Sequence, residues 1–126
     1  MLTVAPGCEL DVERGPDWLL VRVRSLDQDG PDPIPLADEL WLLMERHFAH
    51  RLVLELDQVP TLSRHVLGEL VRLHQRICER GGVMRLCGLS PRNQRVLRAC
   101  RLDDRLTPFE SREDAVMSSG IFRRPR

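Results

Sequence analysis

Residues that could carry out covalent chemistry are few in this chain and poorly arranged for it. Ser63 and His65 are two positions apart, so on a helix they would point in different directions and could not pair as nucleophile and base. The carboxylates at 103–104 follow a short predicted helix, where solvated charge is expected. The glycines at 81–82 are predicted to end a helix, whereas a phosphate cradle precedes one. Lysine and tyrosine are absent, which excludes lysine Schiff bases and tyrosine acids. We therefore predict no catalytic residues and no enzyme.

The cysteines form no recognisable metal or redox motif. They stand at Cys8, Cys78, Cys87 and Cys100, without C-x-x-C spacing. His74 and Cys78 are four apart and could share one helix face, but no second pair completes a metal site. We predict buried free thiols in a reducing, cytoplasmic setting, with no metal and no cofactor.

The composition is that of an ordinary soluble domain. The 126 residues suffice for one core, and 42% hydrophobic with 30% charged residues is typical of globular proteins. No run approaches the roughly 18 apolar residues of a membrane helix, and the start of the chain does not resemble a secretory signal. A net charge of zero argues against nucleic-acid binding.

The zero net charge divides into two opposed halves. Residues 1–60 carry a net charge of −7 and residues 61–126 a net charge of +7. Arg72, Arg76 and Arg80 recur every four residues, and a second arginine group follows at 92–101. Two interpretations remain open. In the first, the arginines lie on solvated helix faces and the aliphatic parts of their side chains cover apolar surface. In the second, they form a docking face for an acidic partner.

The elements that must position these residues follow from hydrophobic periodicity. Period-2 alternation or short apolar runs predict strands over 8–13, 18–24, 51–57, 83–89 and, as a short edge strand, 106–109. Three- and four-residue spacing predicts helices over 36–50, 64–80, 92–101 and from 111 onward. Ser63 and Ser90 are predicted N-caps, and the glycine pair ends the second helix.

This order predicts an α/β fold. We expect a mixed, mostly parallel central sheet of four to five strands after an opening hairpin, covered by about four helices. Residues 1–117 form the predicted single domain, and 118–126 a disordered basic tail.

Residues 52–70, Leu-Val-Leu-Glu-Leu-Asp-Gln-Val-Pro-Thr-Leu-Ser-Arg-His-Val-Leu-Gly-Glu-Leu, resemble the signature of the STAS family, the domain of bacterial anti-sigma factor antagonists. Segments 73–89 and 96–102 are also similar to that family, so the resemblance covers roughly residues 8–117. It implies a STAS-like fold, in agreement with the predicted order of elements. It also implies a non-enzymatic signalling module that binds a kinase-like anti-sigma factor and so regulates sigma-factor-dependent transcription.

The chain departs from the family pattern at its regulatory position. Glu55 and Ser63 stand where the family usually has aspartate, and Arg64 stands where a partner kinase phosphorylates a serine. Arg64 cannot accept phosphate, and its positive charge at a helix N-terminus is the reverse of what phosphate would place there. The resemblance therefore implies binding without the usual switch. Ser63 remains either a helix cap or a displaced phosphosite.

The expected partner-binding side chains lie in the loop before the second helix and along that helix. They are Thr61, Ser63, Arg64, His65, Arg72 and Arg76. The expected partner is an anti-sigma factor or related kinase-fold protein, without nucleic acid or membrane insertion, and homodimer formation is left open. One alternative is a cytoplasmic STAS accessory subunit of a lipid or anion transporter. Another is nucleotide or lipid binding at the sheet edge.

Overall fold

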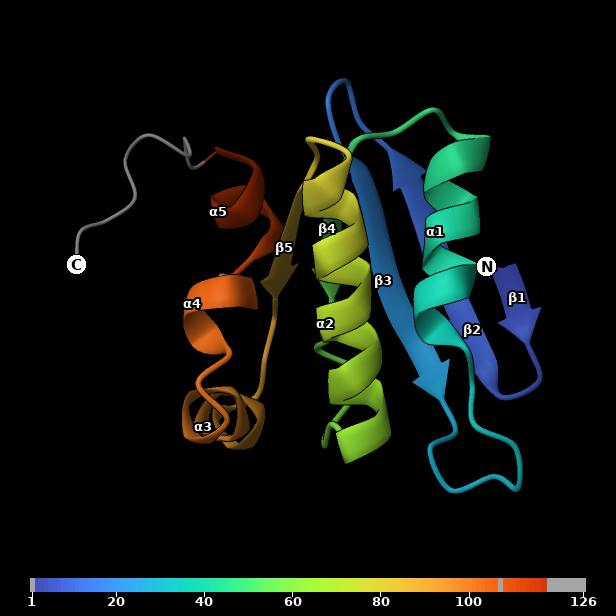
Figure 1. Ribbon diagram of the computed structural model, residues 1–126, viewed down its shortest axis with the longest axis vertical. Helices are drawn as coiled ribbons and strands as arrows, with labels where there is room; N and C mark the ends of the chain where they lie inside the picture. The colour runs from blue at the N-terminus through green and yellow to red at the C-terminus, as the bar shows by residue number, and fades with distance from the viewer. Residues whose placement is uncertain (1, 107, 118–126) are drawn as a thin grey trace.

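The computed structural model describes residues 2–106 and 108–117 (Figure 1). Its elements, in chain order, are β1 (Leu2–Ala5), β2 (Cys8–Arg14), β3 (Leu19–Leu26), α1 (Leu36–Arg46), β4 (Arg51–Glu55), α2 (Arg64–Glu79), β5 (Val83–Cys87), α3 (Pro91–Ala99), α4 (Asp103–Leu106), β6 (Pro108–Phe109) and α5 (Arg112–Met117). The predicted disordered tail lies outside the described residues. No helix in the described part of the chain is both long and apolar enough to span a bilayer.

The strands lie side by side in sequence order, from β1 to β6. The β1–β2 and β2–β3 pairs are antiparallel, and the pairs from β3 to β6 are parallel. This confirms the predicted α/β class and the mostly parallel sheet after an opening hairpin. Helices connect the parallel strands, as such crossovers require.

The described residues form six strands and five helices, whereas four to five strands and about four helices were predicted. Strand β1 was missed because it is short and pairs irregularly with β2 across a turn at Gly7, whose φ is +83°. Helix α4 was also missed. Leu106, predicted to start a strand, instead ends α4, and the edge strand β6 is only Pro108–Phe109. Local alternation over so few residues does not separate a helical turn from a strand.

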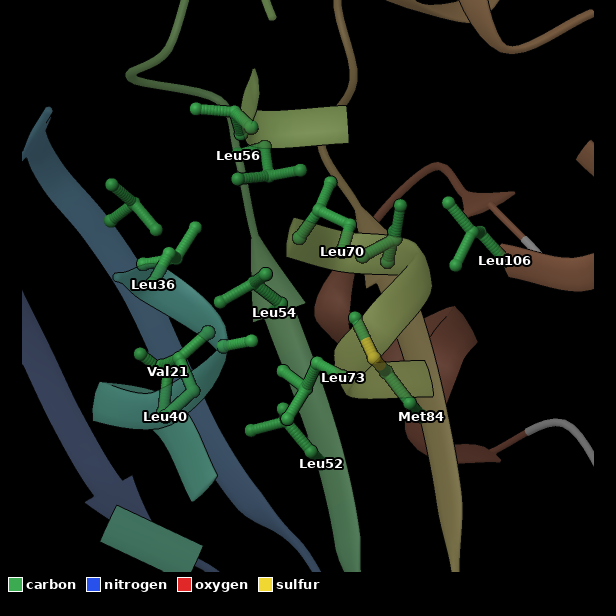
Figure 2. Close-up of a cluster of buried hydrophobic side chains, with 14 of the residues drawn as sticks. Val21, Leu36, Leu40, Leu52, Leu54, Leu56, Leu70, Leu73, Met84 and Leu106 are labelled. Carbon is green, nitrogen blue, oxygen red and sulfur yellow. The ribbon is translucent and has the colours of Figure 1, made fainter. Parts of the chain in front are cut away.

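Each face of the sheet has its own core. Leu52 and Leu54 on β4 pack beneath α1 and α2 in the main cluster, shown in Figure 2. Val53, between them, points to the other face and joins Trp18, the residue immediately before β3, and Ala115 of α5. All three β4 residues are fully buried, which confirms a strand covered on both faces.

Gly82, between α2 and β5, has no space for a side chain. A Cβ there would collide with the His50 carbonyl oxygen and with Ile77 Cγ2. The Gly82 N–H donates to the Ile77 carbonyl at 2.9 Å, so the backbone is held in place. Gly68, inside α2, is the opposite case, because nothing lies within 4 Å of a Cβ built there.

We expect Gly82→Ala to lower the free energy of unfolding by about 1–3 kcal/mol, because the backbone must shift to relieve the overlap. Gly68→Ala, the matched control, should raise it by about 0.5–1 kcal/mol through helix propensity. Urea unfolding of both variants measures this. Equal stabilities for the two variants would contradict the packing described at Gly82.

Candidate functional site

Three loops meet where the parallel strands β3, β4 and β5 end, at the lower end of the molecule in Figure 1. They span residues 27–35, 56–63 and 88–90. In open α/β sheets, binding residues gather in the loops that follow the carboxyl ends of the strands. The middle loop leads into α2 and holds the candidate partner-binding residues that precede the helix.

Ser63 caps α2, as predicted. Its Oγ accepts a hydrogen bond from the Val66 N–H at 3.1 Å. Arg64 is the first helical residue, is exposed, and has no ion-pair partner within the described residues. The first turn of α2 contains no acidic side chain. The Arg64 charge therefore lies at the positive end of the helix dipole, and together they favour contact with an anionic group.

Two side-chain amides hold the loop in a fixed shape. Asn93 of α3 is fully buried; its Oδ1 accepts from the Leu62 N–H at 3.0 Å and its Nδ2 donates to the Val59 carbonyl at 2.9 Å. On the other side, Gln28 accepts from the Ser63 N–H at 2.7 Å and donates to the carbonyl of Thr61 at 2.7 Å. Each amide satisfies one donor and one acceptor of the loop backbone, so the loop is positioned without regular secondary structure.

Neither amide was identified from the sequence. Asn93 lies on the same helix face as Val96 and Leu97, and a polar amide on an apolar stripe is the signal that could have found it. Gln28 lies in a proline-rich loop with no periodicity, and nothing in the local sequence indicates its role.

Thr61 and His65 form hydrogen bonds with α3 and with the 27–35 loop, respectively. The exposed Thr61 accepts a hydrogen bond at its Oγ1 from Arg92 of α3, at 3.2 Å. His65 Nε2 lies 2.9 Å from the carbonyl of Ile34, and since a carbonyl only accepts, Nε2 carries the proton. Thr61, Ser63, Arg64 and His65 thus follow one another at a surface held by the 27–35 loop on one side and by α3 on the other.

A cavity of about 260 Å³ opens beside this surface. The proline-rich loop forms one wall, and Ser63, His65 and Val66 form the other.

Arg72 and Arg76 lie farther along α2, on the side facing α1. Arg72 pairs with Glu69 at 2.6 Å. Arg76 pairs with Asp38 at 3.6 Å, and its guanidinium lies 4.3 Å from the ring centroid of Trp41. Arg72 is eight positions after Arg64 on the helix, about 12 Å along the axis. The structure does not gather these arginines with the loop, and Arg76 covers aromatic surface as the solvated-face interpretation expects.

Glu69 has a structural role that the sequence did not reveal. It is buried, and its Oε1 accepts from the Ala37 N–H at 3.0 Å. Helix α1 follows Pro35, which supplies no side-chain cap. Glu69 therefore caps α1 from α2, and Arg72 balances its charge.

Glu55, the last residue of β4, is the centre of a partly buried ion-pair network. The network lies on the face of the sheet that α1 and α2 do not cover. Only 6% of Glu55 is exposed. It accepts hydrogen bonds from Arg112 Nε of α5 at 2.8 Å and from Arg22 of β3 at 3.3 Å. The hydrogen bonds that the Arg112 guanidinium donates to Glu13 and Glu55 raise its pKa, so it stays charged. The network fixes α5 to the strands whose ends carry the candidate surface.

Several arginines of α3 and α4 extend positive charge away from the loop. Within the described residues, Arg95, Arg98, Arg101 and Arg105 are exposed and make no ion pair. Together with Arg92 they make the segment from α3 to α4 rich in arginine. The electrostatic-docking interpretation therefore applies to this group better than to Arg72 and Arg76.

The prediction of buried thiols is correct for two cysteines and wrong for the other two. Cys8 and Cys87 are buried, whereas Cys78 and Cys100 are exposed. Cys78 follows the buried Ile77, and one helical step rotates a side chain by about 100°, out of the apolar stripe. Cys100 ends α3 at its C-cap. Cys78 Sγ lies 3.5 Å from His74 Nε2, but the described residues contain no group of three or more potential metal ligands.

We expect a thiol reagent at neutral pH to label two cysteines rapidly in the folded protein. Burial raises the pKa of Cys8 to about 11 and of Cys87 to about 12, so both stay protonated and shielded. Cys78 and Cys100 should react, and all four should react in denaturant. Mass spectrometry of the labelled peptides identifies which cysteines have reacted. Rapid labelling of Cys87 in the native state would contradict its burial.

Solved structures share this fold, and one family model matches most of this sequence. A family model described as the STAS domain matches residues 9–115. The NMR structure of the protein TM1081 matches with a TM-score of 0.70 and 15% identity, covering 90% of this chain and 88% of that chain. The crystal structure of TM1081 from Thermotoga maritima, described as a candidate anti-sigma factor antagonist, matches with a TM-score of 0.66 and 17% identity, covering 85% of this chain and 91% of that chain. No curated protein sequence matches. At these identities, the similarity to solved structures shows the fold.

Proposed function

The chain belongs to the STAS domain family, and from this we propose that it is a non-enzymatic signalling module that binds a kinase-like anti-sigma factor and so regulates sigma-factor-dependent transcription. The name of the Thermotoga maritima structure supports the anti-sigma connection. The observation that carries the proposal is the arrangement of the β4–α2 loop. Four backbone groups of this loop are held by Gln28 and Asn93, so its exposed side chains form a pre-organised surface.

The proposed contact surface consists of Thr61, Ser63, Arg64 and His65, with Arg72 and Arg76 at its edge. Arg64 is the proposed anchor, since it is exposed and has no ion-pair partner within the described residues. Arginine presents a planar set of donors that can bind a carboxylate through two hydrogen bonds. An acidic group on the partner would complete this interaction, and the unpaired arginines of α3 and α4 would speed the encounter.

We also propose that binding proceeds without a serine phosphorylation switch. Arg64 occupies the family's phosphorylated position and has no hydroxyl. Ser63, the neighbouring hydroxyl, already accepts from the Val66 N–H, and its own N–H is bound by Gln28. Because the Ser63 hydroxyl is already used as the cap of α2, its proposed role is structural.

Incubation with an anti-sigma kinase and ATP tests the absent switch. The unaltered protein should remain unmodified, while Arg64→Ser should gain one phosphate at that position. A phosphopeptide containing Ser63 from the unaltered protein would overturn this part of the proposal.

Capture from an extract of the source organism tests the partner. The immobilised chain should retain a protein of kinase-like fold, and Arg64→Glu should retain much less of it. The matched control Arg46→Glu, at an exposed arginine in the last turn of α1 and away from the loop, should retain nearly as much. Retention of a membrane-transport complex instead would favour the alternative role as a cytoplasmic accessory subunit of a transporter.

A further inference from the structure

A second cavity lies at the end of the sheet opposite the candidate surface. Its volume is about 340 Å³. It lies between the carboxyl-terminal ends of α1 and α2, at the upper end of both helices in Figure 1. Small-molecule sites are typically concave and mostly apolar, with a few polar groups at defined positions. This cavity has that composition.

Apolar side chains form most of its wall: Trp41, Met44, Phe48, Ala49 and Ile77. Phe48 is 85% exposed and has a φ of +53°. It occupies the left-handed position that ends α1, where the Ala49 N–H donates to the Met44 carbonyl at 2.8 Å. The neighbouring helix α2 uses glycine at the equivalent position, Gly81. A bulky aromatic side chain is thus kept in a backbone conformation that usually favours glycine, at the rim of the cavity.

The polar side chains that line the cavity are those of Arg80, Glu45 and His50. The guanidinium of Arg80 lies 5.2 Å from the ring centroid of Trp41 and has no carboxylate partner within the described residues. Its N–H donors therefore remain available beside an apolar wall. Glu45, also in the lining, is exposed and lies beyond ion-pair distance of Arg80.

Some of the backbone carbonyls at the two helix ends already accept hydrogen bonds within the chain. The Phe48 N–H bonds the Glu45 carbonyl at 3.2 Å, and the Gly82 N–H bonds the Ile77 carbonyl at 2.9 Å. Among the side chains that line the cavity, Arg80 carries a permanent positive charge and has no carboxylate partner within the described residues.

We propose that this cavity binds a small amphipathic carboxylate. The apolar part lies against Trp41, Met44 and Ile77, and the carboxylate accepts charge-assisted hydrogen bonds from Arg80. Because the cavity is at the opposite end of the sheet from the β4–α2 loop, such binding is independent of the proposed partner surface.

Tryptophan fluorescence tests the proposal directly, since the chain has two tryptophans and only Trp41 lines the cavity. In the Trp18→Phe background, the signal comes from Trp41 alone. Sodium octanoate, octylamine and octanol are titrated below their micelle-forming concentrations, and calorimetry with the unaltered chain repeats the octanoate titration. Octanoate should saturate the signal, octanol should bind about tenfold more weakly, and octylamine should not saturate it.

Three substitutions in the same background separate the polar groups. Arg80→Gln should weaken octanoate binding about tenfold, because a charge-assisted interaction is lost. Glu45→Gln should tighten it about twofold by removing a screened repulsion. The control Arg98→Gln, on α3 and outside the cavity, should leave it unchanged. Octanol or octylamine binding as tightly as octanoate, no saturable binding, or an unchanged affinity in Arg80→Gln would each overturn the proposal.

Discussion

Replacing Asn93 with leucine should lower the free energy of unfolding by about 2–4 kcal/mol. The side chains are similar in size, but leucine leaves the Leu62 N–H and the Val59 carbonyl buried without partners. Each orphaned group costs about 1–3 kcal/mol, and relaxation of the loop recovers part of this cost. Urea unfolding of the two proteins measures the difference.

The matched control is the next residue. Gln94 also uses its amide to bind a backbone carbonyl, that of Leu89 at 3.0 Å, but it is exposed. Water can replace that bond, so Gln94→Leu should change stability by less than about 1 kcal/mol. Asn93→Asp keeps the acceptor for Leu62 but loses the donor to Val59 and buries a charge, so it should be no more stable than Asn93→Leu. If Asn93→Leu is as stable as Gln94→Leu, the amide does not hold the loop.

Removing Arg112 should destabilise the fold by about 3 kcal/mol, because it leaves the buried Glu55 carboxylate with Arg22 as its remaining ion-pair partner. Arg112→Met keeps the aliphatic part of the side chain, so the decrease in the free energy of unfolding measures the effect of removing the charge. The double variant Arg112→Met with Glu55→Met removes both charges and should recover a large part of the stability. Chemical denaturation of the two single variants and the double variant gives the coupling energy.

Glu13 supplies the control for this network. It also bonds Arg112, at 2.9 Å, but its side chain is 64% exposed. Glu13→Gln should therefore change stability by less than about 1 kcal/mol. Equal effects of Glu13→Gln and Arg112→Met would indicate that the Glu55 pair contributes no more than a surface contact.

The sequence predicted the features that depend on local periodicity and capping. The buried strand β4, the Ser63 and Ser90 caps and the proline at the start of α3 all follow from patterns a few residues long. These features place the β4–α2 loop at the carboxyl end of the sheet. The exposure of Cys78 was missed because one helical step separates the apolar stripe from solvent.

The side chains that shape the site could not be predicted in this way. Gln28 bonds a loop 33–35 residues away, Asn93 bonds it across 31–34 residues, and Glu69 caps α1 across 32 residues. Such pairings depend on how the strands and helices pack, which no short pattern encodes. The ion-pair partners of Arg72 and Arg76 could not be predicted for the same reason. Their spacing on α2 was clear from the sequence, but their partners on α2 and α1 were not.

The proposed function rests on the β4–α2 loop as the surface that meets the partner. Hydrogen–deuterium exchange of the chain, alone and in complex with the captured kinase-fold protein, tests this most directly. Slower exchange is predicted for the backbone amides of residues 61–68, with residues 80–82 at the opposite end of α2 unchanged. Protection confined to residues 80–82 or to α5, with residues 61–68 unaffected, would contradict the account.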